Sequence, residues 1–221
     1  DATELAIPIY NNNKIVLISP TSTKTKIVNG NGNGYFFRTV PNNQAEAKAL
    51  VNYLLKNKDI QPKKVATFYN NDSKFSQSLK ADFISYLNKN NPNINSNKTY
   101  DLSLKSKITP DQLQKDSQIN ESDKKFSVLM LAGTINDFKQ IYDNLLFDEA
   151  RKFFYLGGDT MYVPEQLTQK NGDIAKKFRN IAIAVPWHHT QINTESHNFV
   201  RTASLLWCQE QGKEDYITWR R

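Results

Sequence analysis

The sequence predicts an α/β protein in which a parallel β-sheet is covered by helices on both faces. Two observations lead to this fold class. Short, continuous apolar runs of the kind found in buried strands recur along the chain, and amphipathic helical patterns follow most of them. Strands that are buried on both faces and alternate with helices are typical of parallel sheets, because each crossover helix covers one face.

The first elements are two extended segments and a helix. The run KIVLISP (14–20) predicts a buried strand that ends at a proline, and YFFRTV (35–40) predicts a second extended segment. Asn42 or Asn43 is suited to cap the helix that follows. The apolar face predicted for that helix consists of Ala45, Ala49, Leu50, Tyr53 and Leu54.

The remaining elements continue this alternation. Strands are predicted at 64–70, 97–104, 126–133, 152–158 and 180–186. A stripe of apolar residues four positions apart predicts a helix after the first of these strands: Phe75, Leu79, Phe83 and Leu87. Further helices are predicted to open at Thr109-Pro110, to span 138–146, to lie between the last two strands, and to span 196–211.

Composition excludes several classes of protein. The chain has 221 residues and a net charge of +7, but only six of its 29 basic residues are arginines, and the lysines are dispersed among acids. Nucleic-acid sites favour clustered arginine, so the charge indicates a solvated surface. No apolar run approaches the ~20 residues of a membrane-spanning helix. The first ten residues show no signal peptide, which is expected to be absent or already removed.

The usual signatures of catalysis and of metal binding are missing. The run NGNGNG (29–34) precedes an extended segment rather than a helix, which indicates Asn-Gly turns and no phosphate loop. His188, His189 and His197 lack the spacing of a zinc site, and the single Cys208 lies in a helical pattern without a base. We therefore expect no catalytic residue, no metal and no cofactor.

Two loops at predicted strand ends carry polar groups. In open parallel sheets, ligands bind at the carboxyl ends of the strands. Ser19-Pro20-Thr21-Ser22-Thr23 is either an ordinary hydroxyl-rich turn or a receptor for a ligand carboxylate. Gly157-Gly158-Asp159-Thr160 places an acid after two glycines, and Asp159 either caps a turn or pairs with a ligand ammonium group. Together the two loops would recognise an α-amino acid.

The order of these segments resembles the type I periplasmic solute-binding proteins, in their branched-chain amino-acid (leucine-binding) branch. The resemblance rests on KIVLISPTST, YFFRTVPNNQAEAKALVNYL and KKVATFYNNDSKFSQSLKADF, and it continues through FSVLMLAGTINDF, KFFYLGGD and IAIAVPWH. It implies a receptor of two α/β lobes that close over a small ligand, without catalysis.

The resemblance also implies a set of ligand-binding residues. Thr21 and Thr23, with Ser22 between them, match the loop that holds the carboxylate and amine of the ligand. Phe75 stands where the family often has a tyrosine, Thr134 lies on another cleft loop, and Asp159 matches the acid that receives the ammonium group. Phe75 lacks the tyrosine hydroxyl, and Asp159 is one methylene shorter than the glutamate of leucine-binding members.

Family members exceed 300 residues, so the resemblance implies one complete lobe plus part of the second. Residues 1–41 would hold the last strand and ligand loop of the first lobe, 42–190 the complete second lobe, and 191–221 a return segment and helix of the first lobe.

The expected function is to bind a small amino acid or related amide in the periplasm or outside the cell. The expected partner is a membrane permease for ABC-type uptake, or a fused signalling domain, and not a nucleic acid. Two alternatives remain: an enzyme on a flavodoxin-like sheet, which would need a nucleotide, flavin or metal, and a degenerate lobe that serves as a protein-interaction domain.

Overall fold

A computed structural model describes most of the chain up to residue 186 and isolated positions beyond it. The described residues are 2–27, 34–60, 62–104, 109, 127–144, 150–163, 180–186, 194, 195, 198, 201 and 202. The chain divides into two compact units, Asp1–Val185 and Pro186–Arg221. The elements described below belong to the first unit.

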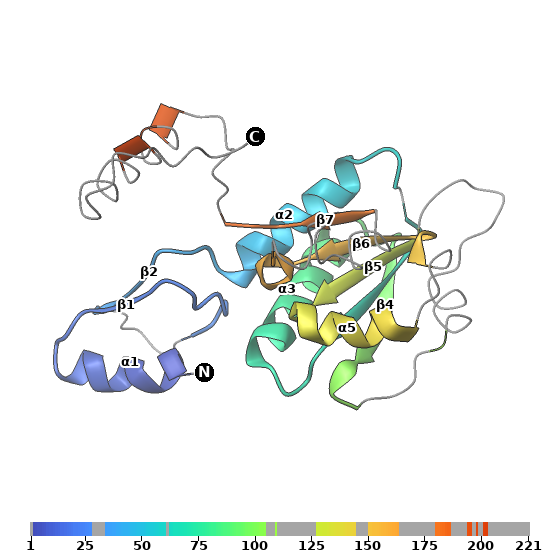
Figure 1. Ribbon diagram of the computed structural model, residues 1–221. Helices are drawn as coiled ribbons and strands as arrows, with labels where there is room; N and C mark the ends of the chain where they lie inside the picture. The colour runs from blue at the N-terminus through green and yellow to red at the C-terminus, as the bar shows by residue number, and fades with distance from the viewer. Residues whose placement is uncertain are drawn as a thin grey trace, which may run out of the picture. The chain divides into compact units, whose positions relative to one another are not determined.

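A five-stranded parallel sheet forms the centre of this unit, as predicted (Figure 1). Neighbouring strands pair in the order β4-β3-β5-β6-β7, and every pair is parallel. The strands are β3 (Lys64–Tyr69), β4 (Asn95–Asp101), β5 (Ser127–Ala132), β6 (Phe153–Gly157) and β7 (Ile181–Ile183). Strand β4 lies at one edge of the sheet, beside β3. The next strand, β5, pairs with the other side of β3, so the strand order reverses between β4 and β5.

The central strand β5 explains why helices cover both faces. All six of its residues are buried. Side chains alternate between the faces of a strand, so Val128 and Met130 join one apolar cluster while Leu129 and Leu131 join the other. A strand with two apolar faces needs a helical layer on each side.

Helices α2 (Asn43–Lys56) and α3 (Lys74–Asn90) cover one face. Each begins at a residue whose side-chain oxygen accepts a backbone N–H from the first turn: Asn42 from Ala45 at 2.9 Å and Ser73 from Ser76 at 3.3 Å. Helix α5 (Ile135–Asn144) covers the other face, where its Phe138 is buried against β6. The 3₁₀ turns Leu102–Leu104 (η1) and Asp159–Met161 (η2) follow β4 and β6.

Two short strands near the start of the chain form a separate small sheet. Helix α1 (Ala2–Asn12) leads into β1 (Leu17–Ser19), which pairs in parallel with β2 (Phe36–Arg38). The predicted strands 14–20 and 35–40 are therefore present but shorter. Helix α1 was not predicted from the sequence, because its interior Pro8 is a residue that usually ends a helix.

Some predicted faces differ from the observed ones. In α2, Ala45 and Ala49 are exposed and Tyr53 is 43% exposed, whereas Ala47 and Val51 are fully buried. The buried face is thus rotated from the predicted one, and of the predicted residues only Leu50 and Leu54 lie on it. In α3 the predicted stripe is correct for its last three members. The helix predicted at 138–146 begins three residues earlier, at Ile135.

Three predicted helices lie outside the described residues wholly or in large part. They are the helix opening at Thr109-Pro110, the one between β6 and β7, and the one at 196–211.

Neighbouring leucines of α2 offer a matched test of this packing. Leu54 is 1% exposed and Leu55 is 36% exposed. Leu54→Ala should lower the free energy of unfolding by about 2–5 kcal/mol, because it leaves a cavity between α2 and the sheet. Leu55→Ala should cost less than about 1 kcal/mol. Denaturant unfolding of both variants measures the difference, and equal losses would contradict the observed orientation of α2.

Candidate functional site

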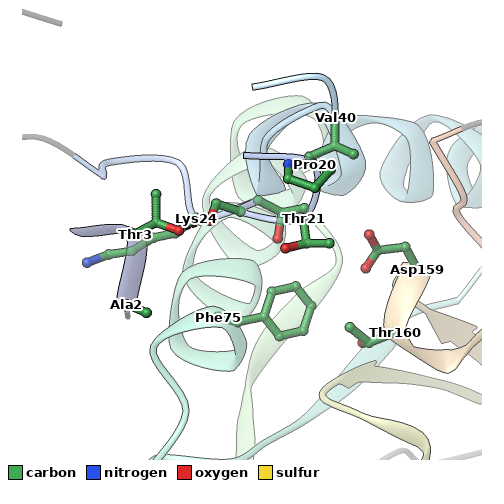
Figure 2. A pocket seen from close by; sticks show the side chains of 11 residues that line it. Ala2, Thr3, Pro20, Thr21, Lys24, Val40, Phe75, Asp159 and Thr160 are labelled. Atoms are coloured by element: carbon green, nitrogen blue, oxygen red, sulfur yellow. Dashed lines mark hydrogen bonds between the residues drawn. The ribbon is translucent and has the colours of Figure 1, made fainter. Parts of the chain in front are cut away.

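A cleft lies where the loop after β1, the start of α3 and the turn after β6 meet (Figure 2). Its volume is about 490 Å³. The residues that matter most for its chemistry are Thr21, Ser22, Thr23, Phe75, Asp159 and Thr160. Five of the six ligand-binding residues predicted from the sequence therefore line a single cleft, and Thr134 is the exception.

Hydrogen bonds hold the hydroxyl-rich loop in a fixed shape. The Ser19 hydroxyl accepts the N–H of Ser22 at 3.1 Å, and the hydroxyls of Ser22 and Thr3 are 2.6 Å apart. Arg38 donates from Nη1 to the carbonyl oxygens of Ser22 and Lys24, at 3.1 and 3.0 Å. The Ser22 hydroxyl is thus occupied within the protein, whereas the neighbouring Thr21 is exposed and lines the cleft.

The same loop is attached to the helices of the main sheet. The carbonyl of Thr23 accepts the N–H of Asn43 at 2.6 Å, at the start of α2. The Thr25 hydroxyl accepts the N–H of Gln44 at 3.0 Å and donates to Asp82 of α3 at 2.6 Å. These bonds hold the loop that carries Thr21 beside the cleft residues of the main sheet.

Phe75 supplies an aromatic surface to the cleft. It belongs to the first turn of α3, and its carbonyl accepts the side-chain amide of Asn43 at 3.2 Å. Figure 2 shows its ring facing the same space as Thr21 and Asp159. Phe75 is half-buried, packs in part against the apolar core and lines the cleft.

Asp159 follows β6 and begins the turn η2. Its Oδ1 is shielded from solvent and has no hydrogen-bond partner within the described part of the chain. Burial raises the pKa of Asp159, and a hydrogen bond from the Thr160 backbone opposes that rise. A shielded carboxylate oxygen without a partner is well suited to receive a cationic donor.

Glu46 is a second carboxyl group, which contacts Asp159 without lining the cleft itself, and it was not predicted from the sequence. Its Oε1 accepts the backbone N–H of Asp159 at 2.6 Å, and its shielded Oε2 has no partner among the described residues. Burial, and then the negative charge of Asp159, raise the pKa of Glu46 to about 8. Acidic residues are common in the first turn of helices, so the sequence alone does not mark Glu46 as a site residue. Glu46 reaches the end of β6 because the fold packs the first turn of α2 against the turn that follows β6.

Thr160 is another cleft residue that was not predicted. Its hydroxyl donates to the carbonyl of Gly133 at 2.7 Å, which joins the turn after β6 to the end of β5.

Thr134 is not among the residues that line the cleft. Its hydroxyl and its N–H both donate to Oδ2 of Asp137, at 2.8 and 2.9 Å, and the Asp137 N–H points back to the Thr134 hydroxyl at 3.4 Å. This is the reciprocal capping arrangement of a helix start. In the structure, Thr134 caps α5.

Lys24 is a cation that lines the cleft, and it is already paired. It donates from Nζ to both carboxylate oxygens of Glu4, each at 2.8 Å. The Lys24 hydrogen bond lowers the pKa of Glu4. The ion pair ties α1 to the loop after β1, and Lys24 is not among the groups that shift the pKa of Glu46 or of Asp159.

Clusters of metal-ligating side chains and membrane-spanning helices are both absent from the described ranges. No group of three or more His, Cys, Asp or Glu side chains comes together there. None of the helices in those ranges is long and apolar enough to cross a membrane. The three histidines and Cys208 lie outside the described residues.

Comparison with known proteins identifies the family. Residues 1–138 match the family model described as periplasmic binding protein, which is more than half of the chain. The chain belongs to the periplasmic binding protein family. The resemblance drawn from the sequence is thereby confirmed. A comparison with curated protein sequences finds no match.

Solved structures support the same assignment for the fold of this periplasmic binding protein. A leucine-binding protein from Thermotoga maritima is similar at a TM-score of 0.66 and 17% identity, covering 96% of this chain and 55% of its own. An ABC transporter substrate-binding protein from Desulfitobacterium hafniense, in complex with Leu, is similar at a TM-score of 0.64 and 16% identity. The match covers 97% of this chain and 56% of that protein.

A branched-chain amino-acid ABC transporter protein from Thermus thermophilus, with bound valine, gives a TM-score of 0.59 at 13% identity and covers 97% of this chain and 51% of its own. The chain therefore spans about half the length of these relatives.

Gly158 should be essential to the geometry of the cleft. A Cβ atom there would lie 2.6 Å from Glu46 Oε1 and 2.9 Å from Cδ2 of the fully buried Leu79. Gly158→Ala should therefore lower the free energy of unfolding by about 1–3 kcal/mol. Gly34→Ala is the matched control, because nothing lies within 4 Å of its Cβ position. Denaturant unfolding compares the two, and a neutral Gly158→Ala would contradict the close approach.

Proposed function

We propose that this periplasmic binding protein is a solute-binding protein that recognises a small amino acid or related amide and performs no catalysis. One observation carries the proposal. The shielded Oδ1 of Asp159 has no partner within the described residues, and Asp159 lines the same cleft as Thr21 and the Phe75 ring.

The three groups match the three parts of an α-amino acid. Asp159 would accept a charge-assisted hydrogen bond from the ammonium group, which is about twice as strong as a neutral one. Thr21 would donate its hydroxyl to the ligand carboxylate. The exposed part of the Phe75 ring would contact an aliphatic side chain. Two of the structurally similar proteins hold Leu and valine, which supports a ligand of this class.

We propose that binding closes two lobes over the ligand. Residues 42–190 would form one lobe, and residues 1–41 with 191–221 would belong to the other. Thr21 and Asp159 would then contact the ligand from different lobes. The bonds from Thr23 and Thr25 to α2 and α3 would belong to the closed state, so that this state makes contacts that the open state lacks. A ligand shifts such an equilibrium by the difference in its affinity for the two states.

The proposed setting follows from the family. A periplasmic or extracellular receptor would deliver its ligand to a membrane permease for ABC-type uptake, or would signal through a domain fused to it. In both cases the permease or signalling domain would recognise the closed, ligand-bound state.

A thermal-shift screen of the twenty amino acids, followed by calorimetry, tests this function. At least one amino acid should raise the melting temperature. Asp159→Asn should weaken its affinity by about 10- to 100-fold, because it removes the charge from the hydrogen bond to the ammonium group.

Asp72→Asn is the matched control, since it removes an exposed carboxylate from the loop after β3. It should bind as tightly as the wild type. Stabilisation by none of the twenty amino acids, or equal affinity of wild type and Asp159→Asn, would refute the proposal.

A further inference from the structure

Asp159 of the cleft and the buried Glu46 beside it form a joined pair. Glu46 stands in the first turn of α2, and Asp159 follows β6; the N–H of Asp159 donates to Glu46 Oε1 at 2.6 Å. This bond uses one oxygen of Glu46. Its Oε2, and Oδ1 of Asp159, are shielded from solvent and have no partner within the part of the chain that the structure describes.

No described cation compensates this pair. From the side of β6, the groups facing Glu46 are Gly158 and Asp159, and α3 presents the apolar Leu79 beside Gly158. The loop after β1 contributes Lys24, which is held by Glu4.

The helix that carries Glu46 offers no compensation either. The next charged residue of α2 is Lys48, which is exposed. Among the described residues, the charged group that shifts the pKa of Glu46 is Asp159, which has the same sign. Two partly buried acids without a cation favour retaining a proton, because the second negative charge would be poorly solvated and would repel the first.

We propose that Glu46, which contacts the cleft residue Asp159 from behind the lining, is a positioning and specificity-determining residue, and that the Glu46–Asp159 pair retains a proton when the cleft is empty and releases it when a ligand with a primary ammonium group binds. This inference rests on the proposed function, because it assigns Asp159 the ammonium group. The ammonium group replaces the proton as the positive charge beside the two acids, and the proton passes to solvent. Neutral ligands cannot make this exchange and are disfavoured.

The direction of the pH dependence follows from the raised pKa of Glu46, which is about 8 in the empty protein. The bound cation lowers this pKa, so Glu46 is protonated before binding at pH 7 and ionised after it. Binding that releases a proton strengthens as the pH rises. The affinity for the ligand should therefore increase with pH between the pKa of Glu46 in the bound protein and its pKa in the empty protein. It should level off above about pH 8.

Calorimetry of the wild-type chain measures proton release directly. L-Leucine, L-valine and L-glutamine serve as probes at pH 7, each titrated in two buffers that differ in ionisation enthalpy. The expected release is roughly half to one proton for each ligand bound, and the affinity should rise up to about tenfold per pH unit between about pH 6 and 8.

The variant Glu46→Gln assigns the proton. Its side-chain amide keeps an oxygen that can accept the N–H of Asp159, but it can neither hold nor release a proton. At pH 8 this variant should bind the amino-acid probe at least about tenfold more weakly than the wild type does. Its affinity should not depend on pH, and binding should release no proton. Asp59→Asn is the matched control, since it removes an exposed carboxylate beyond the far end of α2, and it should release protons as the wild type does.

The outcomes separate this inference from the function on which it rests. Binding by the wild type without proton release leaves the proposed function intact and overturns the role of Glu46. Release that persists in Glu46→Gln assigns the proton to another group, Asp159 included, and also overturns the role of Glu46. If no probe binds the wild type, both the function and the inference fail. The wild-type measurement decides the first and third cases even if Glu46→Gln does not fold.

Discussion

The hydrogen bond from the Asp159 N–H to the Glu46 carboxyl is the constraint on which the cleft depends. It fastens the turn after β6 to the first turn of α2, two segments 113 positions apart in the chain. The contact is possible because residue 158 is a glycine, since any Cβ there would collide with Glu46 and Leu79. The bond fixes the backbone of Asp159 at the cleft and brings the Glu46 carboxyl close enough for the charge of Asp159 to raise its pKa, so the same few atoms set both the shape and the charge of the site.

The parallel sheet brings the other groups to this point. Strands β3, β5 and β6 all end at the same edge, and the turns after them are joined by side-chain bonds: Ser76 of α3 donates to the carbonyl of Ala132, and Thr160 donates to the carbonyl of Gly133. The small sheet of β1 and β2 is linked to this edge through Thr23 and Thr25. These bonds order the side chains at the polar edge of the sheet before a ligand arrives. Ligand binding then costs less conformational entropy.

Much of this could be predicted from the sequence, and the limits have physical causes. The continuous apolar runs of β3, β5 and β6 define strands buried on both faces, and the polar residues that follow strands, Thr21 and Asp159 among them, are predictable cleft residues. Glu46 was not predictable, because its role depends on a long-range contact with the turn after β6. The face of α2 was misplaced because its alanines give a weak periodic signal, and Thr134 was selected by its position after a strand although its hydroxyl caps α5.

The ionisation of Glu46 tests the proposed carboxyl pair most directly. Carbon-13 NMR of the side-chain carboxyl groups, titrated from pH 4 to 10 in the ligand-free protein and assigned with Glu46→Gln, reports the pKa of each acid separately. We predict that Glu46 titrates near pH 8, far above the value of about 4.3 for an unperturbed glutamate. Titration of both Glu46 and Asp159 below about pH 5 would contradict this prediction, because the pair would then carry two charges in the empty cleft and have no proton to exchange for a ligand cation.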